Sequence, residues 1–514
     1  MTNPAEKSQS LTGRALWIMS AKTLAFAFSF ALPLLLVRRL DRYEFGLYKQ
    51  VFLVVGTSVT VLPLAFAMSA FYFLPREPER RRQVVLNILL FYTAVGALAC
   101  LALFVRPSLL AAVFRAPELT ALAPLIGVVI LLWIVSSILE YVAVAHQELR
   151  LATVFIIVAQ LTKTGLLLAA ALATSKVETM VYAAVVQGAL QTVALLAYLR
   201  SRFRGFWRGF EWATMRRQLA YAVPLGLAGM LYTIQLDLPG YVVSYRFDAE
   251  TYAVYAIGCF QLPLVAILSD AIGSVMITRV GVLQKEGRQR EIVQLTARVM
   301  RKLAIIYFPL YALLLIVGRE FITVLFTARY LDSWPVFAVN LTMLPLNILI
   351  LDPVVRAYAG ERHFVVKLHA ALLVVLLAVL WFATQRFGLV GAISAVVFVN
   401  FLGRLATAVR MARVVGVRRE DWRLLNDVGK VAAATMAAAA VAWLARSALA
   451  GVKPFAVLVV CGVVFSLAYL AAALLLGVPT FEERDAARRH VARARHMLRR
   501  RAVEPLPSGG GSNV

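Results

Sequence analysis

The segment Arg39-Leu-Asp-Arg-Tyr-Glu-Phe-Gly-Leu-Tyr48 returns in the second half of the chain as Arg246-Phe-Asp-Ala-Glu-Thr-Tyr-Ala-Val-Tyr255. The Arg, the Asp and the final Tyr are identical, and Leu/Phe, Phe/Tyr, Gly/Ala and Leu/Val replace one another at four further positions. Each copy follows one long apolar stretch and precedes another. A repeat of this kind indicates a chain built from two related halves.

The composition is that of a membrane protein. Hydrophobic residues make up 61% of the 514 residues and the mean hydropathy is +0.79, whereas soluble domains are about 45–50% apolar. We therefore predict an all-α protein that crosses the membrane many times. The polar segment 1–12 has no signal-peptide pattern, so none is expected. The three cysteines lie in apolar segments and indicate neither disulfides nor a metal site.

Apolar runs of about 20 residues, the length that a bilayer requires, predict about fourteen transmembrane helices. The predicted spans are 15–37, 50–73, 84–105, 121–145, 153–173, 180–199, 219–244, 252–277, 303–318, 335–355, 365–383, 389–411, 428–447 and 455–476.

The basic residues predict the orientation of these spans. With a cytoplasmic N-terminus, about 37 of the 53 Lys and Arg residues lie on the cytoplasmic side. Both termini are therefore expected in the cytoplasm. The two repeat copies follow the first and seventh spans and so share one orientation, which predicts a parallel repeat of two six-helix lobes with both copies external. The predicted parts are an N-terminus (1–14), the lobes (15–210 and 211–427), two added helices (428–476) and a basic tail (477–514).

The net charge of +26 does not indicate nucleic-acid binding, because cytoplasmic loops of membrane proteins collect Lys and Arg that meet anionic lipid headgroups. In the tail, Ala487, Val491, Ala494 and Leu498 recur at helical spacing among arginines. This pattern predicts a basic amphipathic helix on the inner leaflet. A solvated tail is the alternative.

Three basic residues fall inside predicted spans: Lys22 in the first, Lys163 near the centre of the fifth, and Arg404 in the twelfth. A charge at bilayer depth is costly and usually faces a bundle interior or a watery cavity. Such cations would attract phosphate or carboxylate groups, and a guanidinium can bind them with two parallel hydrogen bonds. We predict that these three bind substrate. For Lys22 and Arg404, the alternative is a long stem that carries the charge to the headgroups.

Asp237 in the seventh span and Asp270 in the eighth are the acidic counterparts. Either could bind H+ or Na+ and couple transport to an ion gradient, or form a static pair with a buried cation. No other cofactor is expected. The chain has no phosphate-binding loop of the form GxxxxGK[ST], nucleophile elbow or zinc signature. We therefore predict a transporter, not an enzyme, with no catalytic and no metal-binding residues.

The stretch from Arg38 to Tyr48 resembles the loop after the first helix of bacterial polysaccharide flippases of the O-antigen (Wzx) type. These belong to the multidrug/oligosaccharidyl-lipid/polysaccharide exporter (MOP) superfamily, which includes the MATE transporters. Tyr221-Ala-Val-Pro-Leu-Gly-Leu-Ala-Gly229 is similar to the start of their second lobe. The resemblance implies a V-shaped pair of lobes around a cavity, with Lys22 where family members often carry a cavity charge. The predicted second span lacks an internal basic residue, unlike that of the peptidoglycan-precursor flippases, which disfavours lipid II as substrate.

The function implied is translocation of an undecaprenyl-pyrophosphate-linked oligosaccharide across the bacterial inner membrane by alternating access, for O-antigen, capsule or exopolysaccharide. The implied partners are this lipid-linked substrate, membrane lipids, a polysaccharide polymerase and glycosyltransferases. An ion-coupled exporter of cationic drugs is the alternative, although buried cations would repel its substrates. A polysaccharide polymerase or ligase is a further alternative. It usually has a large external loop, and the longest one predicted here has only about seventeen residues.

The repeat itself is not predicted to touch substrate. Arg39, Asp41, Arg246 and Asp248 lie where corresponding helix pairs meet their external turns. We expect them to brace these turns or a closed external gate.

Overall fold

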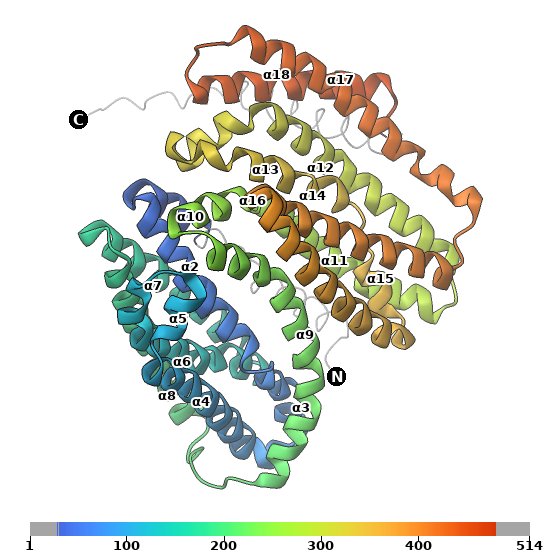
Figure 1. The fold of residues 1–514 in the computed structure, drawn as a ribbon. Coiled ribbons are helices and arrows are strands. Elements are labelled where there is room, and N and C mark those ends of the chain that lie inside the picture. The colour runs from blue at the N-terminus through green and yellow to red at the C-terminus, as the bar shows by residue number, and fades with distance from the viewer. Residues whose placement is uncertain (1–27, 29, 480–514) are drawn as a thin grey trace, which may run out of the picture. The chain divides into compact units, whose positions relative to one another are not determined.

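The computed structural model describes residue 28 and residues 30–479, and these residues form helices and no strands (Figure 1). The predicted all-α membrane fold is confirmed. Nine of the described helices are long and apolar enough to cross a membrane, or up to eleven if each of two bent helix pairs is one span. The predicted count of fourteen is not confirmed.

Breaks inside apolar runs explain much of the difference. The predicted span 335–355 forms only the short helices α13 (Trp334–Leu341) and α14 (Met343–Leu346), followed by non-helical residues. The spans 365–383 and 389–411 fall in one element, α16 (Arg362–Val415), and the predicted break between them is present at Gly388, where φ is +59°. The first predicted span lies mostly outside the described residues. Hydropathy counts apolar length, but it does not register where the backbone stops being helical.

The chain divides into two compact units, of which the first comprises residues 1–292 and 318–416. Besides α13, α14 and α16, its helices are α2 (Arg42–Val61), α3 (Ser69–Arg76), α4 (Arg81–Val105), α5 (Ser108–Phe114), α6 (Glu118–Ala145), α7 (Leu149–Thr174), α8 (Val177–Arg202), α9 (Trp212–Arg246), α10 (Ala249–Gly258), α11 (Pro263–Lys285) and α15 (Asp352–Ala357), with the short 3-10 helices η1 (Phe66–Met68), η2 (Pro78–Arg80), η3 (Ala328–Ser333) and η4 (Ala359–Glu361).

The second unit comprises residues 293–317 and, of the described residues, 417–479. Its described helices are the middle of α12 (Gln289–Phe326), η5 (Arg419–Leu425), α17 (Asn426–Ala448) and α18 (Pro454–Leu475). Small side chains let these helices pack closely: Ala438 and Ala442 of α17 meet Phe465 of α18, and Cys461 packs against Val317 of α12. The predicted added helices therefore associate with residues 293–317. The predicted lobe boundaries remain predictions.

The two repeat copies play the same local role. Asp41 and Asp248 are the N-cap residues of α2 and α10, and each carboxylate accepts a hydrogen bond from the backbone N–H three residues on, at 2.8 and 2.9 Å. An N-cap of this kind satisfies one of the unpaired N–H groups at a helix start. The final tyrosines, Tyr48 and Tyr255, are both buried. The repeat is thus a helix-start motif used twice.

The helices α2 and α10 lie against each other, and Gly46 allows their closest approach (Figure 1). A Cβ at Gly46 would lie 2.5 Å from the Ala249 carbonyl carbon and closer still to its oxygen. The neighbouring atoms are backbone and cannot rotate away. Only glycine therefore fits at this contact without separating the two helices.

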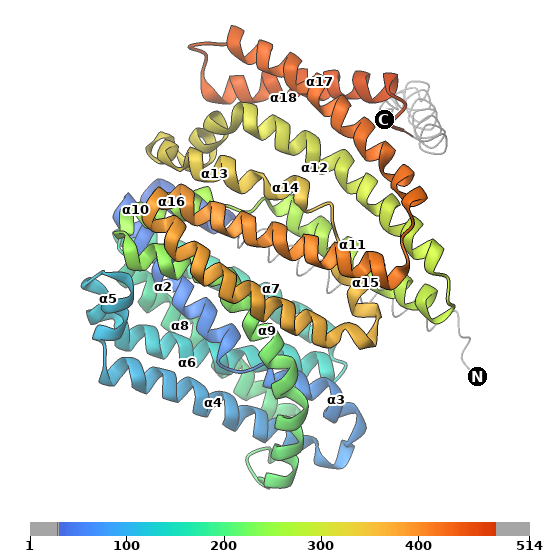
Figure 2. The ribbon, with the colours of Figure 1, turned by 45° about the vertical axis from the view of Figure 1, so that its right-hand side comes forward.

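The helix α9 lies between elements from both halves of the sequence and packs against α2 and α16. The two halves of α16 run side by side (Figure 2), with buried Leu372, Leu376 and Leu380 meeting Ala392 and Val399. Leu53 of α2 and Val243 of α9 join the same apolar core. This core fixes α9 between its neighbours and so positions the polar groups described next.

Candidate functional site

A layer of polar side chains crosses α2, α9 and α16. The Thr57 hydroxyl on α2 donates to the Asp237 carboxylate on α9 at 2.5 Å. Two residues earlier on α9, Gln235 Oε1 lies 3.1 Å from His369 Nδ1 on α16, and the Tyr232 and His369 rings are 5.8 Å apart. Residues two apart on a helix point to different sides, so α9 presents one polar group to each neighbour.

This layer lies inside apolar surroundings, where unpaired polar groups are costly. One turn further along α9, Gly240 faces Leu53: a Cβ at Gly240 would lie 3.0 Å from Leu53 Cδ2. Apolar residues thus close the space between α2 and α9 next to the layer. An ionisable carboxylate and an imidazole held at membrane depth can bind a cation or move a proton.

Asp270, the other predicted ion-coupling residue, does not join this layer. It lies on α11 with an exposed side chain, and its backbone carbonyl accepts a hydrogen bond from the Ser274 hydroxyl. Among the described residues, the structure therefore joins Asp237 to the first half of the chain through Thr57.

Lys49 is a half-buried cation that the predicted spans did not include. The helix α2 begins at Arg42, eight residues before the predicted limit of the second span, so Lys49 lies two turns inside it. The statement that this span lacks an internal basic residue is therefore wrong. Lys49 Nζ lies 5.6 Å from the centre of the Phe45 ring. The N-cap pattern beginning at Asp41 was the signal that could have placed this helix start correctly.

Lys163 lies within the first half of the chain, on α7, which packs against α6 and α8. Its Nζ is 4.1 Å from the centre of the Trp133 ring on α6, a cation–π contact. Rings of Phe52, Tyr48 and Phe45 on α2 continue from Trp133 at centroid distances of 5.9, 4.9 and 6.0 Å. Aromatic contacts therefore connect Lys163 to the neighbourhood of Lys49.

Arg404 lies on the second half of α16 and is anchored by the broken segment after α14. It donates to Asn347 Oδ1 at 2.5 Å and to the Leu349 carbonyl at 2.8 Å. The guanidinium thus bridges a side-chain oxygen and a backbone carbonyl of the non-helical segment. The structure does not bring Arg404 and Lys163 together, and Lys22 lies outside the described residues.

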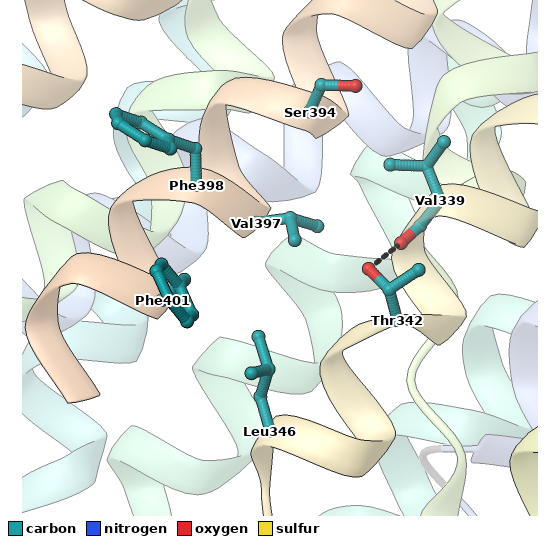
Figure 3. A pocket seen from close by; sticks show the side chains of 7 residues that line it. All are labelled: Val339, Thr342, Leu346, Ser394, Val397, Phe398 and Phe401. Carbon is teal, nitrogen blue, oxygen red and sulfur yellow. Dashed lines mark hydrogen bonds between the residues drawn. The ribbon is translucent and has the colours of Figure 1, made fainter. Parts of the chain in front are cut away.

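The second half of α16 also lines a largely apolar pocket (Figure 3). It has a volume of about 400 Å³, and its lining includes Leu346, Val397, Phe398 and Phe401. The Thr342 hydroxyl on its wall donates to the Val339 carbonyl at 2.6 Å and offers no free donor. Leu346 immediately precedes Asn347, and Phe401 lies about one turn before Arg404. A guanidinium is thus fixed beside a pocket that suits an apolar chain.

The predicted gate residues have separate environments. Arg39 is exposed, Asp41 and Asp248 are the N-caps, and the Arg246 guanidinium stacks on Trp381 with its Cζ 4.1 Å from the ring centre. The ion pair at this end is made by Arg42, which donates to Asp332 at 2.9 Å.

No group of three or more His, Cys, Asp or Glu side chains suited to a metal ion occurs among residues 30–479. Three buried or half-buried cations, a polar layer and an apolar pocket are the features that bear on function.

A family model described as "Polysaccharide biosynthesis protein" matches residues 35–335, more than half of the chain. The chain belongs to this family. No curated protein matches the sequence. The expected membership of a polysaccharide-related membrane family is confirmed.

Solved structures share the fold of this chain at low sequence identity. The lipid II flippase MurJ, in an inward closed conformation, has a TM-score of 0.71 and 11% identity. The match covers 90% of this chain and 98% of MurJ. An inward-facing multidrug resistance MATE transporter of the MOP superfamily has a TM-score of 0.59 and 12% identity, over 77% of this chain and 96% of its own. The Vibrio cholerae MATE transporter VcmN has a TM-score of 0.56 and 12% identity, and the match covers 80% of this chain and 99% of VcmN.

These structures confirm the predicted MATE-like fold. The solved proteins themselves are a flippase and MATE transporters, the class of protein that the sequence predicts.

Proposed function

We propose that the protein is a flippase for an undecaprenyl-pyrophosphate-linked oligosaccharide and acts in the biosynthesis of O-antigen, capsule or exopolysaccharide. The family supports a role in making polysaccharide. The fold, shared with a lipid II flippase, supports a lipid-linked substrate. In this proposal the two lobes expose the substrate to each side of the membrane in turn.

The observation that carries the proposal is Arg404 beside the apolar pocket. A lipid-linked pyrophosphate has an anionic group next to a long hydrocarbon chain, and this neighbourhood offers a guanidinium next to an apolar wall. Arg404 is held by Asn347 and the Leu349 carbonyl, so it is oriented before the substrate arrives. Lys22, Lys163 and Lys49 are the further cations that we propose for the pyrophosphate.

Asp237 is the residue that we propose for coupling to H+ or Na+. Its carboxylate accepts from Thr57 of α2 while sitting on α9, so a change in its charge would alter the bond between helices from the two halves. Asp270 is exposed on α11 and is the weaker candidate. Asp237→Asn should abolish the dependence of transport on the ion gradient, and Asp270→Asn should not.

The location follows from the same proposal. The protein would lie in the bacterial inner membrane with both termini in the cytoplasm, as the distribution of Lys and Arg predicts. Glycosyltransferases would supply its substrate on the cytoplasmic side, and a polymerase would consume the product outside.

The test is a translocation assay in proteoliposomes that contain a fluorescent lipid-linked oligosaccharide and report its leaflet. The wild-type protein should move the substrate, and Arg404→Ala should slow it at least tenfold, as expected for one lost charge-assisted contact. Arg413→Ala, on the exposed side of the same helix, is the matched control. No translocation by the wild-type protein would refute the function. Unchanged transport by a Lys163→Ala, Arg404→Ala double variant would refute only the cation site.

An ion-coupled multidrug exporter is the second candidate, because Asp237 lies in a membrane helix and a relative of the same fold is a multidrug transporter. It predicts that deletion of the gene raises drug susceptibility without accumulation of lipid-linked sugars. Accumulation of these sugars with unchanged susceptibility would exclude it.

A further inference from the structure

A second pocket, with a volume of about 410 Å³, lies where α9 ends and the first half of α16 approaches Gly388. Its walls include Arg115, Tyr245, Arg246, Trp381, Thr384 and Gln385. The charge distribution predicts that this end of the helices is external. All of these residues belong to the first unit.

Aromatic rings hold both arginines in place. Arg246 Cζ lies 4.1 Å from the centre of the Trp381 ring, and Arg115 Cζ lies 5.1 Å from that of Tyr245. Guanidinium stacking on a ring leaves the edge N–H groups available for an acceptor. Arg115 also occupies a left-handed conformation with φ of +50°, which disfavours any residue with a Cβ. Two oriented cations therefore share one cavity.

The pocket contains polar atoms without partners. Arg246 Nε and Thr384 Oγ1 are buried and form no hydrogen bond, and Thr384 is only 2% exposed. Neither Arg115 nor Arg246 pairs with a carboxylate in the part of the chain that the structure describes. A buried charged donor without an acceptor is costly. The chain supplies no acceptor to Arg246 Nε, so a bound ligand with an acceptor oxygen would remove this cost.

Other arginines near this end do have acceptors. Arg42 donates to Asp332 at 2.9 Å, and Arg38 donates to the Val324 carbonyl at 2.7 Å. Arg246 corresponds to Arg39 in the repeat, but Arg39 is exposed and stacks on no ring of the residues that the structure describes. The pocket is therefore a feature of the second copy alone, and the repeat pattern did not predict it.

We infer that this pocket binds an acidic sugar through its oxyanion, with the two guanidiniums around the anion and Thr384 and Gln385 toward the hydroxyls. A carboxylated or phosphorylated sugar carries both kinds of group, and the volume lies in the usual range for ligand pockets. The choice of a sugar rests on the proposed function. On the predicted external side, the pocket would receive the glycan as it leaves the membrane.

Binding to the purified protein tests this without any transport. The protein is placed in phosphatidylcholine nanodiscs and titrated with D-glucuronate, glucose 6-phosphate, D-glucose or inorganic phosphate, with ligand-observed NMR as the readout. Both acidic sugars should bind at least tenfold more tightly than glucose and than inorganic phosphate. Arg246→Ala and Arg115→Ala should each weaken them at least tenfold, whereas Arg106→Ala, an exposed arginine outside the pocket, should not.

Thr384→Val, which keeps the side-chain shape, should weaken binding severalfold and serves if an arginine variant does not fold. Equal binding of glucose, or wild-type affinity in Arg246→Ala, would overturn the inference. Phosphate binding as tight as that of the sugars would reduce the pocket to a bare anion site and overturn the sugar assignment. Loss of sugar binding when phosphatidylglycerol is added would assign the pocket to a lipid headgroup. Failure of the flippase shows separately, as absence of translocation in the proteoliposome assay.

Discussion

The contact between α2 and α10 at Gly46 gives a prediction whose size can be worked out from neighbouring atoms. In Gly46→Ala, the new methyl group meets the Ala249 carbonyl, with 2.5 Å to the carbon and 3.1 Å to Cα. No side chain can rotate to make room. The helices must separate, which also disturbs the adjacent N-caps.

Two effects of opposite sign act on the unfolding free energy. Replacing glycine by alanine inside a helix favours the helix by up to about 1 kcal/mol. Overpacking costs about 1–3 kcal/mol, and a clash with backbone belongs at the upper end of this range. The expected result is a net loss of about 2 kcal/mol.

Gly56 is the matched control, because it lies on the same helix and a Cβ there would meet nothing within 4 Å. Gly56→Ala should be stabilised by up to about 1 kcal/mol. The difference between the two variants removes the propensity effect and isolates the overpacking cost, about 3 kcal/mol or roughly a hundredfold in the unfolding constant.

The assay is reversible unfolding in mixed micelles, followed by tryptophan fluorescence and circular dichroism, with both variants at the same detergent concentration. Equal stability of Gly46→Ala and Gly56→Ala would show that α2 and α10 do not meet as described. A stabilised Gly46→Ala would refute the reasoning outright.

Asp248→Ala should lose about 1 kcal/mol of unfolding free energy and Asp248→Asn almost none, because asparagine caps a helix equally well; equal losses would contradict a capping role. Arg404→Lys should lose about 1–3 kcal/mol although the charge remains, since an ammonium lacks the planar fork that bonds Asn347 and a carbonyl together; a wild-type unfolding curve would refute this. The hydrogen bonds from Arg410 hold the pKa of Glu361 below its ordinary value. The pair therefore stabilises the fold above that ordinary pKa, and this contribution disappears as the pH falls through the lowered value. Glu361→Gln should flatten the acid side of the curve of unfolding temperature against pH, and an unchanged curve would rule the pair out as its cause.

Much of the fold could be predicted from local sequence. Apolar runs identified the membrane helices, and the repeat marked two equivalent turns between helices. The structure adds that the Asp of each copy is an N-cap, which joins residues only three apart. The family resemblance carried by the first repeat agrees with the family match over residues 35–335. The residue at which a helix begins was harder to predict where polar residues precede the apolar run. The second span was predicted to begin eight residues after the start of α2, so Lys49 was placed outside it.

The partners of the candidate site could not be predicted in this way. Lys163 and Arg404 were both found as buried cations, but one faces Trp133 and the other caps the segment after α14. Hydropathy measures how deep a charge lies and not which helix it faces.

The sequence by itself determined that the chain is helical, lies in the membrane and repeats one segment at the turns of corresponding helix pairs, because these properties depend on composition and on short stretches of sequence. Only the tertiary structure decided which charges meet. Asp237 reaches Thr57 across 180 residues, and Arg246, one copy of the repeated arginine, stacks on Trp381 at a pocket while its counterpart Arg39 lies exposed. The physical reason is that the packing of distant helices sets the surroundings of a side chain, and identical local motifs therefore acquire different roles.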